Sequence, residues 1–171
     1  MLEAFYPNEY VDSAYGIPFE ELYGKGYRGI IFDVDNTLVP HGAPADGRSV
    51  ALFKRLYRIG FSTCILSNNK EPRVAPFAGE VGSPYIYKGG KPSVKGYEKA
   101  MSVMKTDRRN TLFIGDQLFT DVWGANRTGL YSILVKPMNP KEEIQIVLKR
   151  YLEAVVLWFY LRKRKKHVRE A

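Results

Sequence analysis

Two aspartates, Asp33 and Asp35, lie at the end of a short apolar run rich in branched residues, over positions 29–34. Carboxylates two residues apart, where a strand ends, can point in different directions. One can then act as an ionised nucleophile while the other serves as a general acid and later as a general base. The alternative for an isolated Asp-x-Asp sequence is a turn in which the side chains cap the backbone.

A second set of polar residues could bind an anion. Ser67 follows another apolar run, over 61–66, and Pro72 suits the start of a helix whose first amides would face a phosphate. Lys91 precedes Pro92, which again suits a helix start, and its side chain could reach the same anion. Taken singly, Ser67 fits an ordinary loop and Lys91 fits a solvated surface lysine.

A third set of residues, Asp116 and Asp121, follows the apolar run 111–114. Asp116 could share a hard cation with Asp33, and Mg²⁺ suits such a site because it prefers oxygen ligands and retains several waters. The alternative is that these acids cap the following helix, whose positive end favours carboxylates. Because an acid pair, a hydroxyl, a lysine and a second acid pair follow successive apolar runs, we favour one shared site.

These residues need a scaffold that brings them together. Short apolar runs predict strands over 29–34, 61–66, 84–87, 111–114 and 131–135, and apolar spacings of three and four predict helices over 46–59, 92–104 and 119–127. Strands that alternate with helices indicate a central parallel sheet covered on both faces, which is a three-layer α/β fold. The carboxyl ends of parallel strands meet at one edge of the sheet, where ligands bind.

The composition restricts the class of protein. With 171 residues, 45% of them hydrophobic and 26% charged, the chain is predicted to fold as a single domain over 1–171. Its one cysteine excludes a disulfide framework and a thiolate metal cluster. The apolar stretch 154–161 is too short to span a bilayer, and we expect no signal peptide, so a cytoplasmic protein is predicted.

The C-terminal segment, from about 141 to 171, combines an amphipathic, aromatic helix with a basic end. Positions 162–171 hold six lysines or arginines and one glutamate, which contribute +5 of the net charge of +8. Such a segment suits the interface of an anionic membrane, where it would hold the protein peripherally at the inner face. The alternatives are a last helix packed on the sheet with a solvated end, or a surface for RNA or another partner.

Four motifs in this chain resemble those of the haloacid dehalogenase (HAD) superfamily. They are Asp33-Val-Asp-Asn-Thr-Leu-Val39, Leu66-Ser-Asn-Asn69, Gly90-Lys-Pro92 and Gly115-Asp-Gln-Leu-Phe-Thr-Asp121, within a resemblance that spans 28–137. The resemblance implies a Rossmann-like HAD core. It also implies a phosphatase, because the second acid of the first motif serves phosphoryl transfer, whereas halide displacement needs no acid for its leaving group.

By this resemblance, Asp33 is the nucleophile and forms an aspartyl-phosphate. Asp35 protonates the leaving oxygen and later activates water. Mg²⁺ would be bound by Asp33, by Asp116 and by the main-chain carbonyl of Asp35. Asp121 would be a further acid that orients Lys91 or metal-bound water.

The resemblance assigns phosphate binding to Ser67, Asn68 and Lys91. HAD enzymes often choose their substrates through a cap domain, but only 31 residues separate Asp35 from Ser67 and 23 separate Ser67 from Lys91. Neither interval holds a cap of ordinary size, which is typical of the capless subfamily IIIA. An open site favours a large substrate, one presented at a surface, or a partner that closes the site.

The stretch 7–11, the first motif and the missing cap are similar to the YqeG-like group of small bacterial HAD phosphatases, which is related to the mitochondrial phosphatidylglycerophosphate phosphatases. This similarity implies removal of the terminal phosphate from phosphatidylglycerophosphate, an anionic lipid precursor. The alternatives are a phosphatase for a protein, nucleotide or sugar phosphate, and an RNA- or ribosome-associated binding protein on an HAD scaffold. The intact set of acids favours an enzyme over the binding protein, so nucleic acid is the less favoured partner.

Overall fold

The computed structural model describes residues 2–139 and 144–170, and the side chains of 2–139 and 149–165. Within these residues, six parallel strands form one sheet in the order β1-β6-β5-β2-β3-β4. The strands are β1 (Glu9–Val11), β2 (Gly29–Phe32), β3 (Ser62–Leu66), β4 (Tyr85–Ile86), β5 (Thr111–Gly115) and β6 (Tyr131–Val135). The predicted α/β fold with a central parallel sheet is confirmed.

Helices and loops connect the strands, and a long helix follows the last strand. The helices are α1 (Phe19–Gly24), α2 (Gly47–Ile59), α3 (Glu71–Val81), α4 (Val94–Met104), α5 (Trp123–Thr128) and α6 (Ile144–Glu170). A π-helical turn, Leu118–Val122, leads directly into α5. The intervals after β2 and β3 hold only α2 and α3 with their loops, so no cap domain is inserted there.

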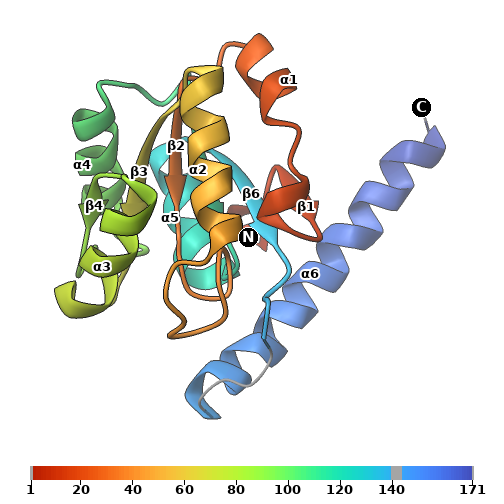
Figure 1. Cartoon of the computed structure of the whole chain (residues 1–171). Helices are drawn as coiled ribbons and strands as arrows, with labels where there is room; N and C mark the ends of the chain where they lie inside the picture. The colour runs from red at the N-terminus through yellow and green to blue at the C-terminus, as the bar shows by residue number, and fades with distance from the viewer. Residues whose placement is uncertain (1, 140–143, 171) are drawn as a thin grey trace.

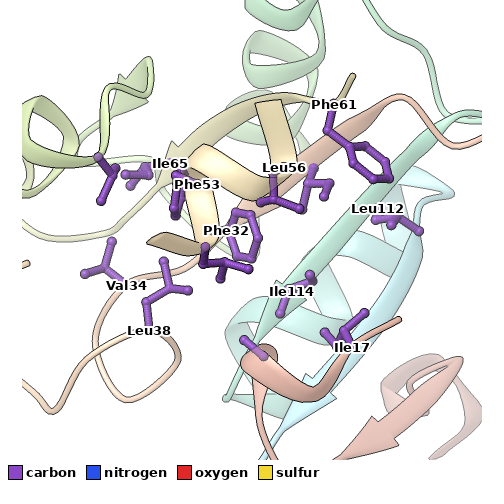
Figure 2. Packing of buried hydrophobic residues seen from close by; sticks show 14 of the residues in the cluster. Ile17, Phe32, Val34, Leu38, Phe53, Leu56, Phe61, Ile65, Leu112 and Ile114 are labelled. Carbon is purple, nitrogen blue, oxygen red and sulfur yellow. The ribbon is translucent and has the colours of Figure 1, made fainter. Parts of the chain in front are cut away.

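The central strands are buried on both faces, and their side chains alternate between two cores. Ile30 and Phe32 of β2 pack in a core that also includes residues of α1, α2 and α3. Figure 2 shows Phe32 beside Phe53 and Leu56 of α2. Ile31 belongs to the opposite core, with residues of α4 and α5. This double burial explains why the sequence of β2 is a continuous apolar run without alternation.

Several local features differ from the sequence prediction. Helix α1 is not predicted, and the helix predicted over 119–127 is the π-helical turn followed by α5. β1 is not predicted, because three partly buried residues give no apolar run, yet it pairs with β6 at the edge of the sheet. The helix predicted from Pro92 begins only at Val94, and the peptide bond between Lys91 and Pro92 is cis. Pro92 therefore belongs to the loop that carries Lys91 and is not the first residue of the helix.

Helix α6 lies against the edge of the domain and its C-terminal end projects away from the sheet (Figure 1). Val156 and Tyr160 are its buried apolar residues among those described. Val156 packs in a third core with Leu134 of β6, and the ring of Tyr160 lies 5.4 Å from that of Tyr6. Positions 141–143 and 171 of the predicted C-terminal segment lie outside the described residues, as do the side chains of 144–148 and 166–170.

The outer face of α6 is apolar. Most of the apolar residues that the sequence places on one face of this helix are exposed, namely Tyr151, Leu152, Val155 and Phe159. Trp158 is exposed as well. The backbone stays helical through the basic positions as far as Glu170. No described helix is both long enough and apolar enough to cross a membrane.

Candidate active site

The polar residues singled out by the sequence converge at the carboxyl edge of the sheet. Asp33 and Asp35 follow β2, Ser67 follows β3, Lys91 follows β4, and Asp116 follows β5. A cavity of about 210 Å³ opens there. It is lined by Asp33, Asp35, Asn36, His41, Ser67, Asn68, Asn69, Lys91, Gln117, Thr120 and Lys149, all of which are polar or charged.

The ammonium group of Lys91 lies between two carboxylates. Its Nζ donates to Oδ1 of Asp33 and to Oδ1 of Asp121, at 2.6 Å in each case. Burial alone would lower the pKa of Lys91, but Asp121 and Asp33 outweigh burial and raise that pKa above its ordinary value. Lys91 is therefore a fixed positive charge at the floor of the cavity.

Asp121 is held by the backbone of the loop that it faces. Its Oδ2 accepts from the backbone amides of Asp116 and Gln117, at 3.1 Å in each case. The carboxylate approaches Gly115 so closely that a Cβ atom there would lie only 2.6 Å from it. Gly115 is thus required by the position of Asp121, which in turn orients Lys91.

The residues present fit a divalent cation. Ligand oxygens of Asp33, Asp116 and Asp121 lie within 4.8 Å of one another, and all three residues are buried. Burial raises the pKa of Asp33 to about 7 against the opposing effect of Lys91. Burial, reinforced by Asp33 and Asp121, also raises the pKa of Asp116 well above its ordinary value. A hard divalent ion prefers oxygen ligands, and its positive charge would stabilise the ionised form of these crowded carboxylates.

The side chain of Asp35 lies outside that carboxylate cluster, so only its main-chain carbonyl is left for the metal contact that the resemblance implies for this residue. Its Oδ1 accepts from the guanidinium of Arg73 at 2.7 Å and from the backbone amide of Gly42 at 2.8 Å. Its Oδ2 accepts from Nδ2 of Asn69 at 2.6 Å. These three donors fix the Asp35 carboxylate at the wall of the cavity.

Ser67 and Asn68 organise the loops beside the cavity. The side chain of Asn68 bonds both backbone groups of Lys91, accepting from its N–H at 2.8 Å and donating to its carbonyl at 3.0 Å. Oγ of Ser67 accepts from the backbone amide of Asn69 at 3.2 Å. Asn68, predicted to bind phosphate, thus holds the backbone of the residue that presents the ammonium group.

Sequence reasoning misses two arginines at this site. Arg73, on the first turn of α3, pairs with Asp35, and its place just after Pro72 at a predicted helix start is the signal that could have found it. Arg150 comes from α6. It donates to the carbonyl oxygen of Asp116 at 2.8 Å and to the Oδ2 of the same residue. No motif marks Arg150, because the contact depends on how α6 folds back across the end of β5.

Comparison with known proteins identifies relatives of this chain. The HAD-hydrolase-like family model matches residues 89–141, the stretch that includes Lys91, Asp116 and Asp121. The chain is 38% identical over 170 residues to the "Probable phosphatase YqeG" of Bacillus subtilis, and the match covers 98% of both chains. It is also 27% identical over 164 residues to the chloroplastic/mitochondrial phosphatidylglycerophosphate phosphatase 1 of Arabidopsis thaliana.

That second match covers 86% of this chain but only 45% of the plant protein, so the chain spans about half the length of this relative. Among solved structures, the cobalt-bound form of the deoxy-D-mannose-octulosonate 8-phosphate phosphatase of Haemophilus influenzae has a TM-score of 0.51 at 13% identity. The alignment covers 80% of this chain and 90% of that one, which shows a shared fold. The chain belongs to the YqeG-like family of the HAD superfamily, and it is an HAD phosphatase.

Proposed function

We propose that this phosphatase is a Mg²⁺-dependent phosphomonoester hydrolase that works through an aspartyl-phosphate on Asp33 and acts on phosphatidylglycerophosphate. The observation that carries the proposal is the placement of Asp33. Its carboxylate lies in a polar cavity, is hydrogen-bonded to the fixed positive charge of Lys91, and belongs to the buried carboxylate cluster that fits a divalent cation.

In the first step, a carboxylate oxygen of Asp33 forms a bond to phosphorus as the bond from phosphorus to the ester oxygen breaks. Asp35 gives its proton to the leaving oxygen. In the second step, the Asp35 carboxylate takes a proton from water, and the oxygen of that water attacks the same phosphorus. The bond between phosphorus and Asp33 breaks, which releases inorganic phosphate and restores both aspartates.

The other residues support these two steps. Lys91 and Ser67 bind the phosphoryl oxygens, and Asp121 keeps the ammonium group of Lys91 in place. Asp33, Asp116 and the main-chain carbonyl of Asp35 would hold Mg²⁺, which would supply positive charge where negative charge spreads over the phosphoryl oxygens. Preorganised positive charge in a cavity stabilises the transition state more than it stabilises the bound ester.

The proposed substrate rests on two relatives, from Arabidopsis thaliana and Chlamydomonas reinhardtii, and on the size of the cavity. Two relatives named phosphatidylglycerophosphate phosphatase 1 match this chain, although it covers only 45% and 55% of their lengths. The cavity of about 210 Å³ takes a phosphoryl group and a short polar alcohol. Acyl chains would remain outside this cavity, where an open site can receive a headgroup from a membrane surface.

The test is phosphate release in the presence of Mg²⁺ from phosphatidylglycerophosphate in mixed micelles, compared with a phosphopeptide, a nucleotide and a sugar phosphate. We expect the lipid to be turned over fastest. Faster release from one of the soluble esters would keep the phosphatase and discard the lipid. No release from any ester by the folded, Mg²⁺-bound protein would favour the RNA-associated binding protein.

The outer face of α6 supports peripheral attachment to the cytoplasmic face of the membrane. Exposed aromatic residues on this helix, Trp158 and Phe159, are followed by the basic residues of 162–165. An apolar face next to cations matches the chemistry of an anionic lipid interface, where each cation contributes about 1 kcal/mol at low salt.

Binding to sedimented vesicles tests this attachment. The protein is expected to bind vesicles that contain phosphatidylglycerol and not purely zwitterionic vesicles. Trp158→Ala should weaken binding by about fivefold to tenfold, because the apolar surface that the indole ring would bury in the membrane interface is lost. The matched control is Tyr87→Ala, which removes an aromatic residue that is 41% exposed outside α6. Equal binding to both kinds of vesicle, or equal effects of the two substitutions, would contradict membrane docking by α6.

A further inference from the structure

Helix α6 supplies one wall of the active-site cavity. Lys149 of this helix lines the cavity together with Asp33, Ser67 and Lys91, which lie at the carboxyl edge of the sheet. In sequence it is remote from all of them, and it reaches the site only because α6 crosses the end of β5. The wall that a cap domain would form in other HAD enzymes is thus formed in part by the C-terminal helix.

The position of Lys149 is fixed by its neighbours on α6. The guanidinium of Arg150 binds the carbonyl oxygen of Asp116 at 2.8 Å and also bonds to the carboxylate of that residue. Glu153 accepts from Arg150 at 3.0 Å and from the backbone amide of Phe119 at 3.3 Å. These contacts attach the first turns of α6 to the loop after β5, so Lys149 is presented from a rigid element.

Lys149 differs from the other cations at the site. Lys91 is paired with Asp33 and Asp121, Arg73 is paired with Asp35, and Arg150 with Asp116. Among the residues that the structure describes, Lys149 has no carboxylate partner. Its ammonium group is therefore available to an anion that enters the cavity beside the phosphoryl group.

The lining of the cavity restricts the kind of alcohol that can carry this anion in the substrate. All of the residues that line it are polar or charged, so no apolar side chain faces the alcohol of the substrate and many hydrogen-bonding groups do. Its volume of about 210 Å³ is below the range of roughly 300–1,000 Å³ common for drug-sized ligands. A short, hydrophilic alcohol fits both properties.

We infer that Lys149 determines specificity by binding a second phosphate of the substrate, one carried by the alcohol that leaves. This inference rests on the proposed phosphatase activity and narrows its substrates to phosphomonoesters of short polyols that bear a further phosphate. The second phosphate can belong to a lipid headgroup or to a soluble ester, since the chemistry that Lys149 recognises is the same in both.

The test compares three esters: glycerol 3-phosphate, soluble glycerophosphoglycerol phosphate, and phosphatidylglycerophosphate in micelles. The wild-type enzyme should prefer the two esters with a second phosphate, mainly through a lower KM. Lys149→Gln should raise the KM for both by about fivefold, the effect of losing one partly solvated ion pair. Lys149→Arg should retain the preference, and Lys54→Gln, the same charge change at an exposed position of α2, is the matched control.

A wild-type enzyme without preference for the second phosphate would overturn the assignment, and so would a preference that survives in Lys149→Gln. A preference for the lipid ester alone would mean that the micelle surface, and not Lys149, determines the specificity. Calorimetry with glycerophosphoglycerol phosphate on the Asp33→Asn protein separates this inference from the proposed hydrolysis. Binding that weakens when Lys149→Gln is added supports the subsite whether or not any ester is hydrolysed, and unchanged binding refutes it.

Discussion

Asp33→Asn is expected to reduce phosphate release by at least about 10⁴-fold with every ester that the wild-type enzyme hydrolyses, because loss of a covalent nucleophile removes the main route of reaction. The amide has nearly the same shape as the carboxylate and can still accept the hydrogen bond from Lys91. The loss should therefore fall on kcat. Asp12→Asn, at an exposed position where the aspartate pairs with Lys136, is the matched control and should keep full activity.

The same variant should be more stable than the wild-type protein when metal is removed. Burial raises the pKa of Asp33 from 3.8 to about 7, so the folded state resists ionisation of this group. As the pH rises from about 4 to about 7, the metal-free wild type is expected to lose stability that the asparagine variant keeps. Because the pKa of Asp33 is about 7 in the folded state and 3.8 ordinarily, the difference in stability between the two proteins has an upper limit of ~4 kcal/mol at pH 8.

Thermal unfolding in EDTA at pH 4, 6 and 8 measures this difference, and circular dichroism establishes that the variant is folded. The difference in stability should vanish near pH 4 and be largest at pH 8. A variant that is inactive but equally stable at all three pH values would mean that Asp33 ionises normally. A variant with appreciable turnover would rule out Asp33 as the nucleophile.

Lys91→Met is expected to damage both stability and activity. The side chain of Lys91 is 3% exposed and is the cation between Asp33 and Asp121. Removing one partner of a buried ion pair leaves uncompensated charge, which costs about 3–5 kcal/mol. Phosphate release should fall by about 10³-fold or more, because a preorganised charge for the transferring phosphoryl group is lost and Asp33 becomes harder to ionise.

The double variant Lys91→Met/Asp121→Asn separates the two effects. It removes one of the two carboxylates left without a cation, so chemical denaturation should show part of the lost stability restored. Activity should stay as low as in the single variant, because the charge that faces the phosphoryl group is still missing. Recovery of activity in the double variant would show that Lys91 acts only by neutralising Asp121.

The strands and the acids at their ends could be predicted because their signals are local. β2 and β5 are continuous apolar runs, and Asp33 and Asp116 follow them directly. Parallel pairing then brings these acids together whatever the loops do. The same reasoning gives Lys91, since a short strand precedes it and its loop must return to the same edge.

Other parts of the site depend on packing that the sequence does not reveal. β1 is too short and too exposed to give a strand signal, and it is defined by its pairing with β6. Arg150 lies on a helix whose apolar residues predict a packed face, yet several of them are exposed, among them Leu152 and Val155. Tertiary contacts determine which side of such a helix packs against the domain. Here the ion pair of Arg150 with Asp116 is one of these contacts.

The attachment of α6 at Arg150 also has a geometric consequence. From Arg150 to Lys165 the helix is uninterrupted, and at 1.5 Å per residue it is about 22 Å long. The helix therefore sets a distance: whatever its far end binds is held at a fixed distance and direction from Asp116. Without the contacts of Arg150, a tilt of only 10° about this point would move the far end of the helix by about 4 Å.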